Sequence, residues 1–169
     1  MSQEDYVLRI ATQAARAIAR ILGFKQTGQY QQALLQIDQT LQEFLDLSAS
    51  LASQLSASEL IMMCRFGSVL DKDKALLLAT LLKEEGDIYA ATNQSNESHQ
   101  RYLKSLQIAL EALIDGGPTL GREYLPLVET LTIKLEDSGI NSDVRYDLSE
   151  YYEKIGDSAK AKRYFRGGK

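Results

Sequence analysis

Apolar residues recur every three or four positions along almost the whole chain. In the first stretch, apolar side chains stand at Tyr6, Ile10, Ala14, Ala17 and Ile21, with mostly polar residues between them. This spacing places the apolar side chains on one face and predicts an amphipathic α-helix. The same pattern along the rest of the chain predicts eight helices in all, at about 6–21, 30–45, 56–67, 73–92, 96–115, 123–137, 142–155 and 158–166.

Residues that are typical of helix ends mark several of these boundaries. Ser56 and Glu59 have the spacing of a capping box ahead of an apolar run. Pro126 fits the first turn of a helix that begins near Glu123, because a proline there removes no intrahelical hydrogen bond. No run alternates convincingly between apolar and polar residues, and valine is scarce. We therefore expect an all-α fold without strands.

One short motif, here called the hairpin motif, occurs three times. A large residue is followed at offsets of four, five and four by Gly or Asn, by Ala or Ser, and by a second large residue. Gly or Asn suits the left-handed backbone at a helix end, the small residue lets two helices approach closely, and the large residues fill the seam. The three copies are Phe24, Gly28, Ala33 and Ile37; Tyr89, Asn93, Ser98 and Tyr102; and Tyr152, Gly156, Ala161 and Phe165.

The three copies predict antiparallel helical hairpins near 17–47, 74–115 and 142–166. Ungapped recurrence indicates a repeat, and the motif resembles the tetratricopeptide repeat. The second copy is the most similar, because Gly86 stands three residues before Tyr89, as in the G-x-x-Y of that family. The other two copies lack this glycine, and none has the closing proline of the family.

This resemblance covers about half of the chain directly and implies one TPR-like domain over residues 1–169. The implied fold is an irregular right-handed array of α-helical hairpins. The N-terminal segment 1–41 is also similar to an uncharacterised bacterial family of short repeat-containing proteins. That second resemblance implies no activity.

The distances between the turns depart from a regular array of tetratricopeptide repeats. Two tandem repeats of about 34 residues would span about 68 residues. The interval from Gly28 to Asn93 and the interval from Asn93 to Gly156 are both a few residues shorter than that. Each interval has room for one extra helix, near 56–67 and near 123–137. We therefore expect two units of three helices followed by a final hairpin, in a compact and irregular array.

Composition and charge narrow the class of protein. The chain has 169 residues, of which 44% are hydrophobic and 25% are charged, as in an ordinary globular domain. The net charge of -4 argues against nucleic-acid binding, and the basic stretch at 160–169 fits the negative end of a helix dipole. The single cysteine excludes an intrachain disulfide and favours a reducing compartment. The chain opens without an apolar signal sequence, and its longest apolar run, at 75–82, is too short to span a membrane. We expect a cytoplasmic protein.

Residues that carry catalytic chemistry are sparse. His99 is the only histidine, which excludes a histidine metal cluster or a catalytic triad. Cys64 stands in an apolar helical pattern typical of an inert core thiol. Asp71 or Asp73 is better explained as a helix cap than as a calcium ligand, and no phosphate-binding loop is present. We expect no enzyme activity, no cofactor and no metal site.

The tetratricopeptide resemblance implies a concave surface, lined by the first helix of each hairpin, that accepts a peptide or a partner helix. Position by position, it marks Lys25, Lys83, Asp87, Tyr146 and Glu150 as partner-binding residues. The carboxylate clamp of the family, which needs Lys and Asn one turn apart, is absent. The alternative is that these residues lie on solvated or core faces with no binding role.

Three functions follow from these observations, in order of preference. The first is a non-catalytic protein–protein interaction module, a scaffold or adaptor in a bacterial cytoplasm. The second is a regulator that senses a peptide or small ligand, although no effector domain is visible in the sequence. The third is an enzyme of unknown class.

The C-terminal hairpin carries an unusual number of aromatic residues. Tyr151 and Tyr152 are adjacent, so we expect that both cannot face the same seam, and that with Tyr164 they leave an exposed aromatic patch. A second copy of the protein would cover that patch in a two-fold homodimer. The alternative is that the patch packs back onto the extra helix at 123–137.

Overall fold

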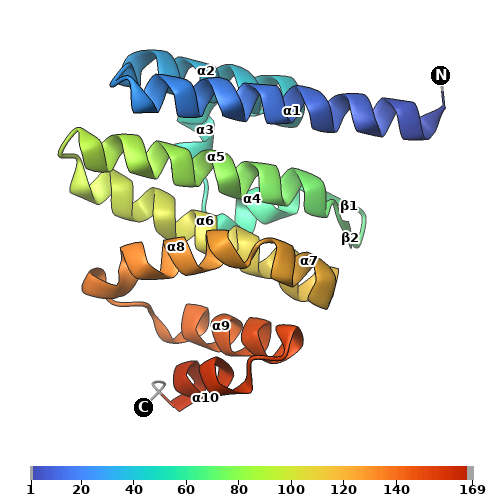
Figure 1. Cartoon of the computed structure of the whole chain (residues 1–169), viewed down its shortest axis with the longest axis vertical. Coiled ribbons are helices and arrows are strands. Elements are labelled where there is room, and N and C mark those ends of the chain that lie inside the picture. The colour runs from blue at the N-terminus through green and yellow to red at the C-terminus, as the bar shows by residue number, and fades with distance from the viewer. Residues whose placement is uncertain (1, 167–169) are drawn as a thin grey trace.

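The computed structural model describes residues 2–166, which form helical hairpins stacked in layers (Figure 1). The three hairpins are α1 (Gln3–Gln26) with α2 (Tyr30–Leu45), α5 (Lys72–Ala91) with α6 (Ser95–Gly116), and α9 (Ser142–Ile155) with α10 (Ser158–Arg166). Between them lie α3 (Ala49–Gln54), α4 (Ala57–Met63), β1 (Arg65–Phe66), β2 (Val69–Leu70), α7 (Pro118–Glu123), α8 (Leu125–Leu135) and the 3-10 helix η1 (Glu136–Ser138). The all-α fold class is confirmed. Helices α2, α5, α6, α9 and α10 begin and end within about one residue of the predicted positions, whereas α1 extends beyond its predicted range of 6–21 at both ends.

The turns of the three hairpins have the same backbone geometry. Gly28, Asn93 and Gly156 have φ values of 70°, 60° and 89°, in the left-handed region. In each turn, the carbonyl of the first motif residue accepts a hydrogen bond from the amide five residues later, at 2.8 Å for Phe24, 2.8 Å for Tyr89 and 2.9 Å for Tyr152. This is the long hydrogen bond of a Schellman helix end. The hairpin motif therefore encodes one repeated turn.

The small residue of each hairpin motif lies in the seam between the two helices. Ala33, Ser98 and Ala161 are all buried. In the second hairpin, the Tyr102 ring packs directly against Gly86, where an added Cβ would come within 2.6 Å of the ring. Glycine at this position thus permits close contact between α5 and α6.

The prediction that the chain forms no strands is wrong at one place, between α4 and α5. Gly67 has a φ of 62°, and the residues on either side form a two-residue antiparallel pair, with Arg65 opposite Leu70 and Phe66 opposite Val69. Residues 56–67 therefore do not form one helix. Two-residue strands are too short to show an alternating pattern, which is why the apolar periodicity missed them.

Each of the two extra helices is shorter than predicted and is preceded by a short helix that was not predicted, α3 before α4 and α7 before α8. In the first interval, Leu55 is extended, with ψ of 144°, and Ser56 caps the new helix α4 through the predicted capping box with Glu59. In the second, α7 ends before Tyr124, and Pro126 stands in the first turn of α8. Proline has no N–H to continue the hydrogen-bond ladder of α7 into α8, which explains the break.

The core is centred on α5, which is buried on most of its circumference. Leu78, Ala79, Leu81, Leu82 and Ile88 of α5 are each 1% exposed or less. Figure 1 shows the α1–α2 hairpin on one side of the α5–α6 pair and α7, α8, α9 and α10 on the other. The first helix of a regular repeat would present a charged face to solvent. In α5, the first helix of the second hairpin, neighbouring helices largely cover that face.

The predicted aromatic patch at the C-terminal end is absent from the surface. Tyr151 and Tyr152 are both buried, at 0% and 2% exposure, so the expectation that they leave an exposed aromatic patch with Tyr164 is wrong. The Tyr151 hydroxyl donates a hydrogen bond of 2.6 Å to the carbonyl of Gly121 in α7, and the Tyr152 ring stacks on the Tyr164 ring at 5.6 Å. Helix α9 lies between α7 and α10, so adjacent residues face different neighbours. The reason for predicting a dimer is removed.

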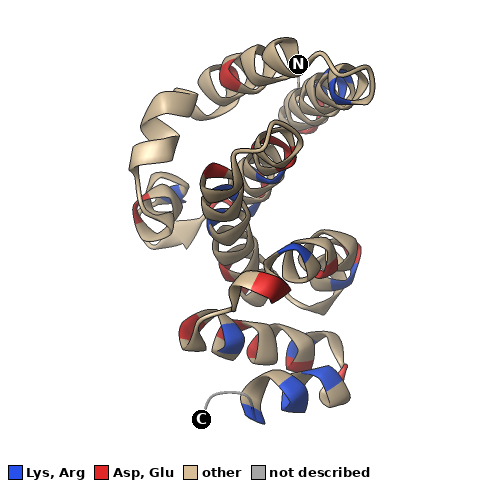
Figure 2. Cartoon of the chain, turned by 90° about the vertical axis from the view of Figure 1, so that its left-hand side faces the viewer, with Lys and Arg blue, Asp and Glu red and all other residues tan. Residues whose placement is uncertain are grey.

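Phe165 also departs from its predicted place. Its side chain is 70% exposed, whereas the equivalent Ile37 and Tyr102 are buried. Helix α2 packs against α5, and α6 packs against α8, but among residues 2–166 no helix packs on the outer face of α10. Figure 2 shows that α10 carries only basic charges, as the basic tail predicted, although residues 167–169 lie outside the described part.

Candidate functional site

Three of the predicted partner-binding residues meet in one cluster between α1 and α5. The Lys25 ammonium contacts the Glu84 carboxylate and lies 2.7 Å from Oδ2 of Asp87. Lys83 Nζ lies 2.8 Å from the same Asp87 oxygen. On its other side, Oδ1 of Asp87 is 3.1 Å from Lys134 Nζ of α8. These five residues are called the lysine–acid cluster below.

Asp87 is the centre of the lysine–acid cluster, and Tyr102 of α6 completes its shell. The Tyr102 hydroxyl donates a hydrogen bond of 2.7 Å to Oδ1 of Asp87. Burial acts to raise the pKa of Asp87, but hydrogen bonds from Lys25, Lys83 and Tyr102 outweigh it and hold the pKa well below its usual range. Asp87 is therefore ionised at any physiological pH.

The lysine–acid cluster faces the interior. Side-chain exposure is 18% for Lys25, 19% for Lys83 and 14% for Asp87, and each charge already has a partner of opposite sign. Together with Tyr102, the cluster joins α1, α5, α6 and α8, so it connects the first two hairpins and α8. Lys25, Lys83 and Asp87 are therefore paired with one another and mostly buried, because neighbouring helices cover α5 from both sides.

The other two predicted residues, Tyr146 and Glu150, lie on α9, which the α5–α6 pair separates from α1 (Figure 1). Tyr146 is 61% exposed and Glu150 is partly buried. The five predicted residues therefore do not form one surface.

Glu84 and Glu85 point to opposite sides of α5, as their adjacency predicts. While Glu84 joins the lysine–acid cluster, Glu85 Oε2 accepts a hydrogen bond of 2.8 Å from Nε of Arg101. Both partners of this pair are buried. Burial raises the pKa of Glu85, and the Arg101 guanidinium opposes that shift. The two ion pairs fix α5 against both of its neighbours, so their chemistry is structural.

The single cysteine is buried, as the sequence predicts. Cys64 is buried at the end of α4, and burial raises the pKa of its thiol to about 11, so the thiolate that a nucleophile requires is scarce at neutral pH. His99 is partly buried in the first turns of α6. Within residues 2–166, no group of three or more His, Cys, Asp and Glu side chains is arranged to hold a metal ion.

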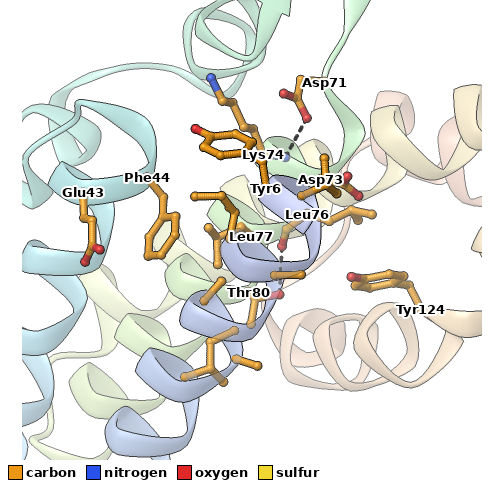
Figure 3. Close-up of a pocket in the computed structure, with 16 residues that line it drawn as sticks. Tyr6, Glu43, Phe44, Asp71, Asp73, Lys74, Leu76, Leu77, Thr80 and Tyr124 are labelled. Carbon is orange, nitrogen blue, oxygen red and sulfur yellow. Dashed lines mark hydrogen bonds between the residues drawn. The ribbon is translucent and has the colours of Figure 1, made fainter. Parts of the chain in front are cut away.

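A cleft of about 580 Å³ opens beneath the N-terminal half of α1 (Figure 3). Its walls come from one face of α1, from the end of α2, from the first half of α5, and from Tyr124 between α7 and α8. Figure 3 shows Glu43 and Phe44 on one side of the cleft and Tyr124 on the other. The cleft residues on α1 are Tyr6, Val7, Ile10, Ala11, Ala14, Ala15 and Ile18, and those on or next to α5 are Asp71, Asp73, Lys74, Leu76, Leu77 and Thr80.

The cleft and the lysine–acid cluster occupy the two ends of the same helix pair. Helices α1 and α5 run in the same direction, and Lys25 ties their C-terminal ends together through Glu84 and Asp87. Their N-terminal halves are not tied in this way, and the space between them is the cleft. Sequence analysis missed it because the pairing of α1 with α5 depends on tertiary contacts between segments that lie far apart in the chain.

A second surface feature is a group of exposed apolar side chains at the end of α4 and on the β1–β2 strand pair. This group is called the hairpin patch below. Its members are Met62 at 70% exposure, Met63 at 47%, Phe66 at 92% and Val69 at 66%. Phe66 and Val69 are directly opposite each other across the strand pair, so their side chains lie on the same face. The only sequence signal for this feature was the Gly67–Ser68 pair after Phe66, a turn signal inside an apolar run.

The hairpin patch stands on a fixed base. Cys64 before β1 and Leu70 at the end of β2, both at the end of the strand pair away from the turn, are buried, and the Asp71 amide donates a hydrogen bond of 2.8 Å to the Cys64 carbonyl. Arg65 donates a hydrogen bond of 3.1 Å to the Ser68 carbonyl and forms an ion pair of 2.9 Å with Glu111 of α6. The exposed side chains are thus presented by an anchored turn.

Comparison of the chain with protein-family models, with curated proteins and with solved structures finds no match. In the part of the chain from residue 2 to residue 166, none of the helices combines the length and the apolar character that crossing a bilayer requires.

Proposed function

We propose that this protein is a non-catalytic protein–protein interaction module, a scaffold or adaptor, whose docking surface is the hairpin patch. The observation that carries this proposal is that four large apolar side chains are exposed close together in the sequence, Met62 and Met63 at the end of α4 and Phe66 and Val69 on the anchored strand pair. Burial of one such side chain from water contributes about 1.5–3 kcal/mol. An apolar surface of this kind on a folded domain marks an interaction site.

The chemistry of the hairpin patch suits a protein partner. Phe and Met are enriched at protein–protein interfaces, and methionine adapts its shape to different partner surfaces. Because the strand pair is already held by Arg65, Cys64 and Asp71, little conformational freedom is lost when a partner binds. The hairpin patch is therefore pre-organised for docking.

The relation to tetratricopeptide repeats belongs to the same proposal. The shared Schellman hydrogen bond at the three turns and the burial of Ala33, Ser98 and Ala161 support it. The docking surface differs from the one that this resemblance implied, because Lys25, Lys83 and Asp87 are occupied by one another. We place the module in a bacterial cytoplasm, in agreement with its single buried cysteine.

Affinity capture from cells of the source organism tests the proposal. Tagged wild-type protein is compared with a Phe66→Ser/Val69→Ser variant and with a Phe165→Ser control, which removes a similarly exposed aromatic residue elsewhere. Loss of central apolar contacts costs about 2 kcal/mol or more, so captured partners should fall roughly 30-fold for the first variant only. Circular dichroism and thermal melting confirm that both variants are folded. An unchanged set of partners with the Phe66 and Val69 variant would exclude the hairpin patch.

A further inference from the structure

The cleft beneath α1 exists because α1 is longer than its partner. Helix α1 has 24 residues and α2 has 16, so the N-terminal turns of α1 extend past the end of α2 (Figure 1). Asp46 adopts a left-handed conformation at the end of α2, with φ of 50°, and the chain turns away there. Helix α2 therefore does not continue along the N-terminal half of α1, and the space beside this half is left open as the cleft.

The α1 side of the cleft is shallow and apolar. Ala11, Ala14 and Ala15 lie between the larger Ile10 and Ile18, so small side chains widen the middle of the cleft. The contacts run from Tyr6 to Ile18, which is roughly 18 Å along the helix axis at about 1.5 Å per residue. On the opposite wall, Leu76 is buried and Leu77 is partly buried. A volume of about 580 Å³ is within the range of about 300–1,000 Å³ that small-molecule sites have.

The polar groups of the cleft lie at its rim, and most are negative. Glu43, Asp71 and Asp73 oppose a single cation, Lys74. The Asp71 carboxylate accepts a hydrogen bond from the Lys74 amide, and the Thr80 hydroxyl donates to the Leu76 carbonyl, so these two groups are used within α5. Glu43, Asp73 and Lys74 form no ion pair with any residue of the described chain. The rim therefore favours a positively charged group.

We infer that this cleft binds a small cationic amphiphile, a molecule with an apolar body and a positively charged head. The apolar body lies on the face of α1 between Ile10 and Ile18 and against Leu77, and Phe44 and Tyr124 border it on the two sides. The charged head lies at the rim, beside Asp73 or Glu43. The bound molecule thus lies between α1 and α5. This inference does not depend on the hairpin patch.

A series of octyl compounds that differ only in the head tests the charge preference. Octyltrimethylammonium, octyl glucoside and octanoate are titrated below their micelle concentrations. The chain has no tryptophan, so a Phe44→Trp variant supplies a single fluorescent reporter at the cleft. We expect saturable binding, with octyltrimethylammonium about tenfold or more tighter than octanoate, a difference of about 1.4 kcal/mol. Equal affinities, the reverse order, or no saturable change would overturn the inference.

Filling the cleft tests the location. Ala14→Phe places a large side chain in the cleft, whereas Ala19→Phe makes the same substitution at an exposed position of α1 that does not line it. We expect about a tenfold or greater loss of octyltrimethylammonium affinity with Ala14→Phe and none with Ala19→Phe, measured by calorimetry. Ala11→Phe, at a more exposed cleft position, is the second variant if Ala14→Phe does not fold. Undiminished affinity in the filled variant, or equal loss in the control, contradicts a site beneath α1.

A final pair of variants tests the rim. Glu43→Gln with Asp73→Asn removes two negative charges and keeps the shape, so the preference for octyltrimethylammonium over octyl glucoside should disappear. The control is Glu97→Gln, at an exposed position in the first turn of α6 that does not line the cleft. A preference that survives in the double variant shows that the rim carboxylates do not select the head.

Discussion

Lys25 and Asp87 are separated by 62 residues in the sequence, and their side chains meet with Nζ 2.7 Å from Oδ2. This contact ties the C-terminal end of α1 to the C-terminal end of α5, and Lys83, Lys134 and Tyr102 converge on the same carboxylate. One aspartate of α5 thus contacts side chains from α1, α6 and α8.

Replacement of Asp87 should therefore be strongly destabilising. Asp87→Asn leaves Lys25 and Lys83 largely buried without their common anion, and loss of one partner of a buried ion pair costs about 3–5 kcal/mol. Since the cluster keeps some exposure, we expect a smaller loss of about 2–4 kcal/mol by urea unfolding. Adding Lys25→Met should recover part of this loss. A cost below about 0.5 kcal/mol, the size typical of an ordinary surface substitution, would show that the cluster contributes little.

The same aspartate should make stability depend on pH in the acid range. The pKa of Asp87 is lowered in the folded protein, so its contribution is complete above the pKa of the unfolded chain, near 4, and is lost as pH falls further. The difference in unfolding free energy between wild type and Asp87→Asn should therefore narrow from about pH 5 down to about pH 2. The raised pKa of Glu85 acts in the opposite direction but is common to both proteins. A constant difference over this range would contradict the assignment.

Two glycines inside helices should respond in opposite ways to alanine. At Gly86, an added Cβ would lie 2.6 Å from two ring carbons of Tyr102, so α5 and α6 must separate or the ring must move. We expect Gly86→Ala to cost about 1–3 kcal/mol. At Gly23 of α1, nothing lies within 4 Å of the added atom, and Gly23→Ala should stabilise by about 0.5–1 kcal/mol. Thermal denaturation distinguishes the two, and equal shifts would contradict the close packing at Gly86.

Adjacent aromatic residues in α10 provide a matched pair at the C-terminal end. Tyr164 stacks on Tyr152 at 5.6 Å, whereas Phe165 is 70% exposed. Tyr164→Asp should cost about 2–4 kcal/mol because it places a carboxylate against a buried ring. Phe165→Asp should change stability by about 0.5 kcal/mol or less. Stability is measured by chemical denaturation. A larger loss with Phe165→Asp than with Tyr164→Asp would show that Phe165 fills the seam, as the hairpin motif alone predicts.

The hairpins themselves follow from local sequence. Gly28, Asn93 and Gly156 end helices because their backbone tolerates positive φ, and the small residue five positions later lets the next helix pack closely. These effects act over a few residues, so a pattern of residue types is enough to predict them. The boundaries of α5, α6, α9 and α10 were therefore predicted closely.

The surfaces depended on contacts between distant segments. Lys25, Lys83 and Asp87 look like exposed charges on separate helices, and only the pairing of α1 with α5 turns them into an enclosed cluster. Tyr151 is buried against α7, where the Gly121 carbonyl accepts a hydrogen bond from its hydroxyl. Phe165 is exposed, although the equivalent position of the hairpin motif is buried in the other two hairpins. Periodicity reports which face of a helix is apolar, but the neighbour that covers that face is set by how the helices stack. For this reason the sequence determined the helices and their turns, while the tertiary structure decided the cleft, the ion pairs and the exposed apolar residues.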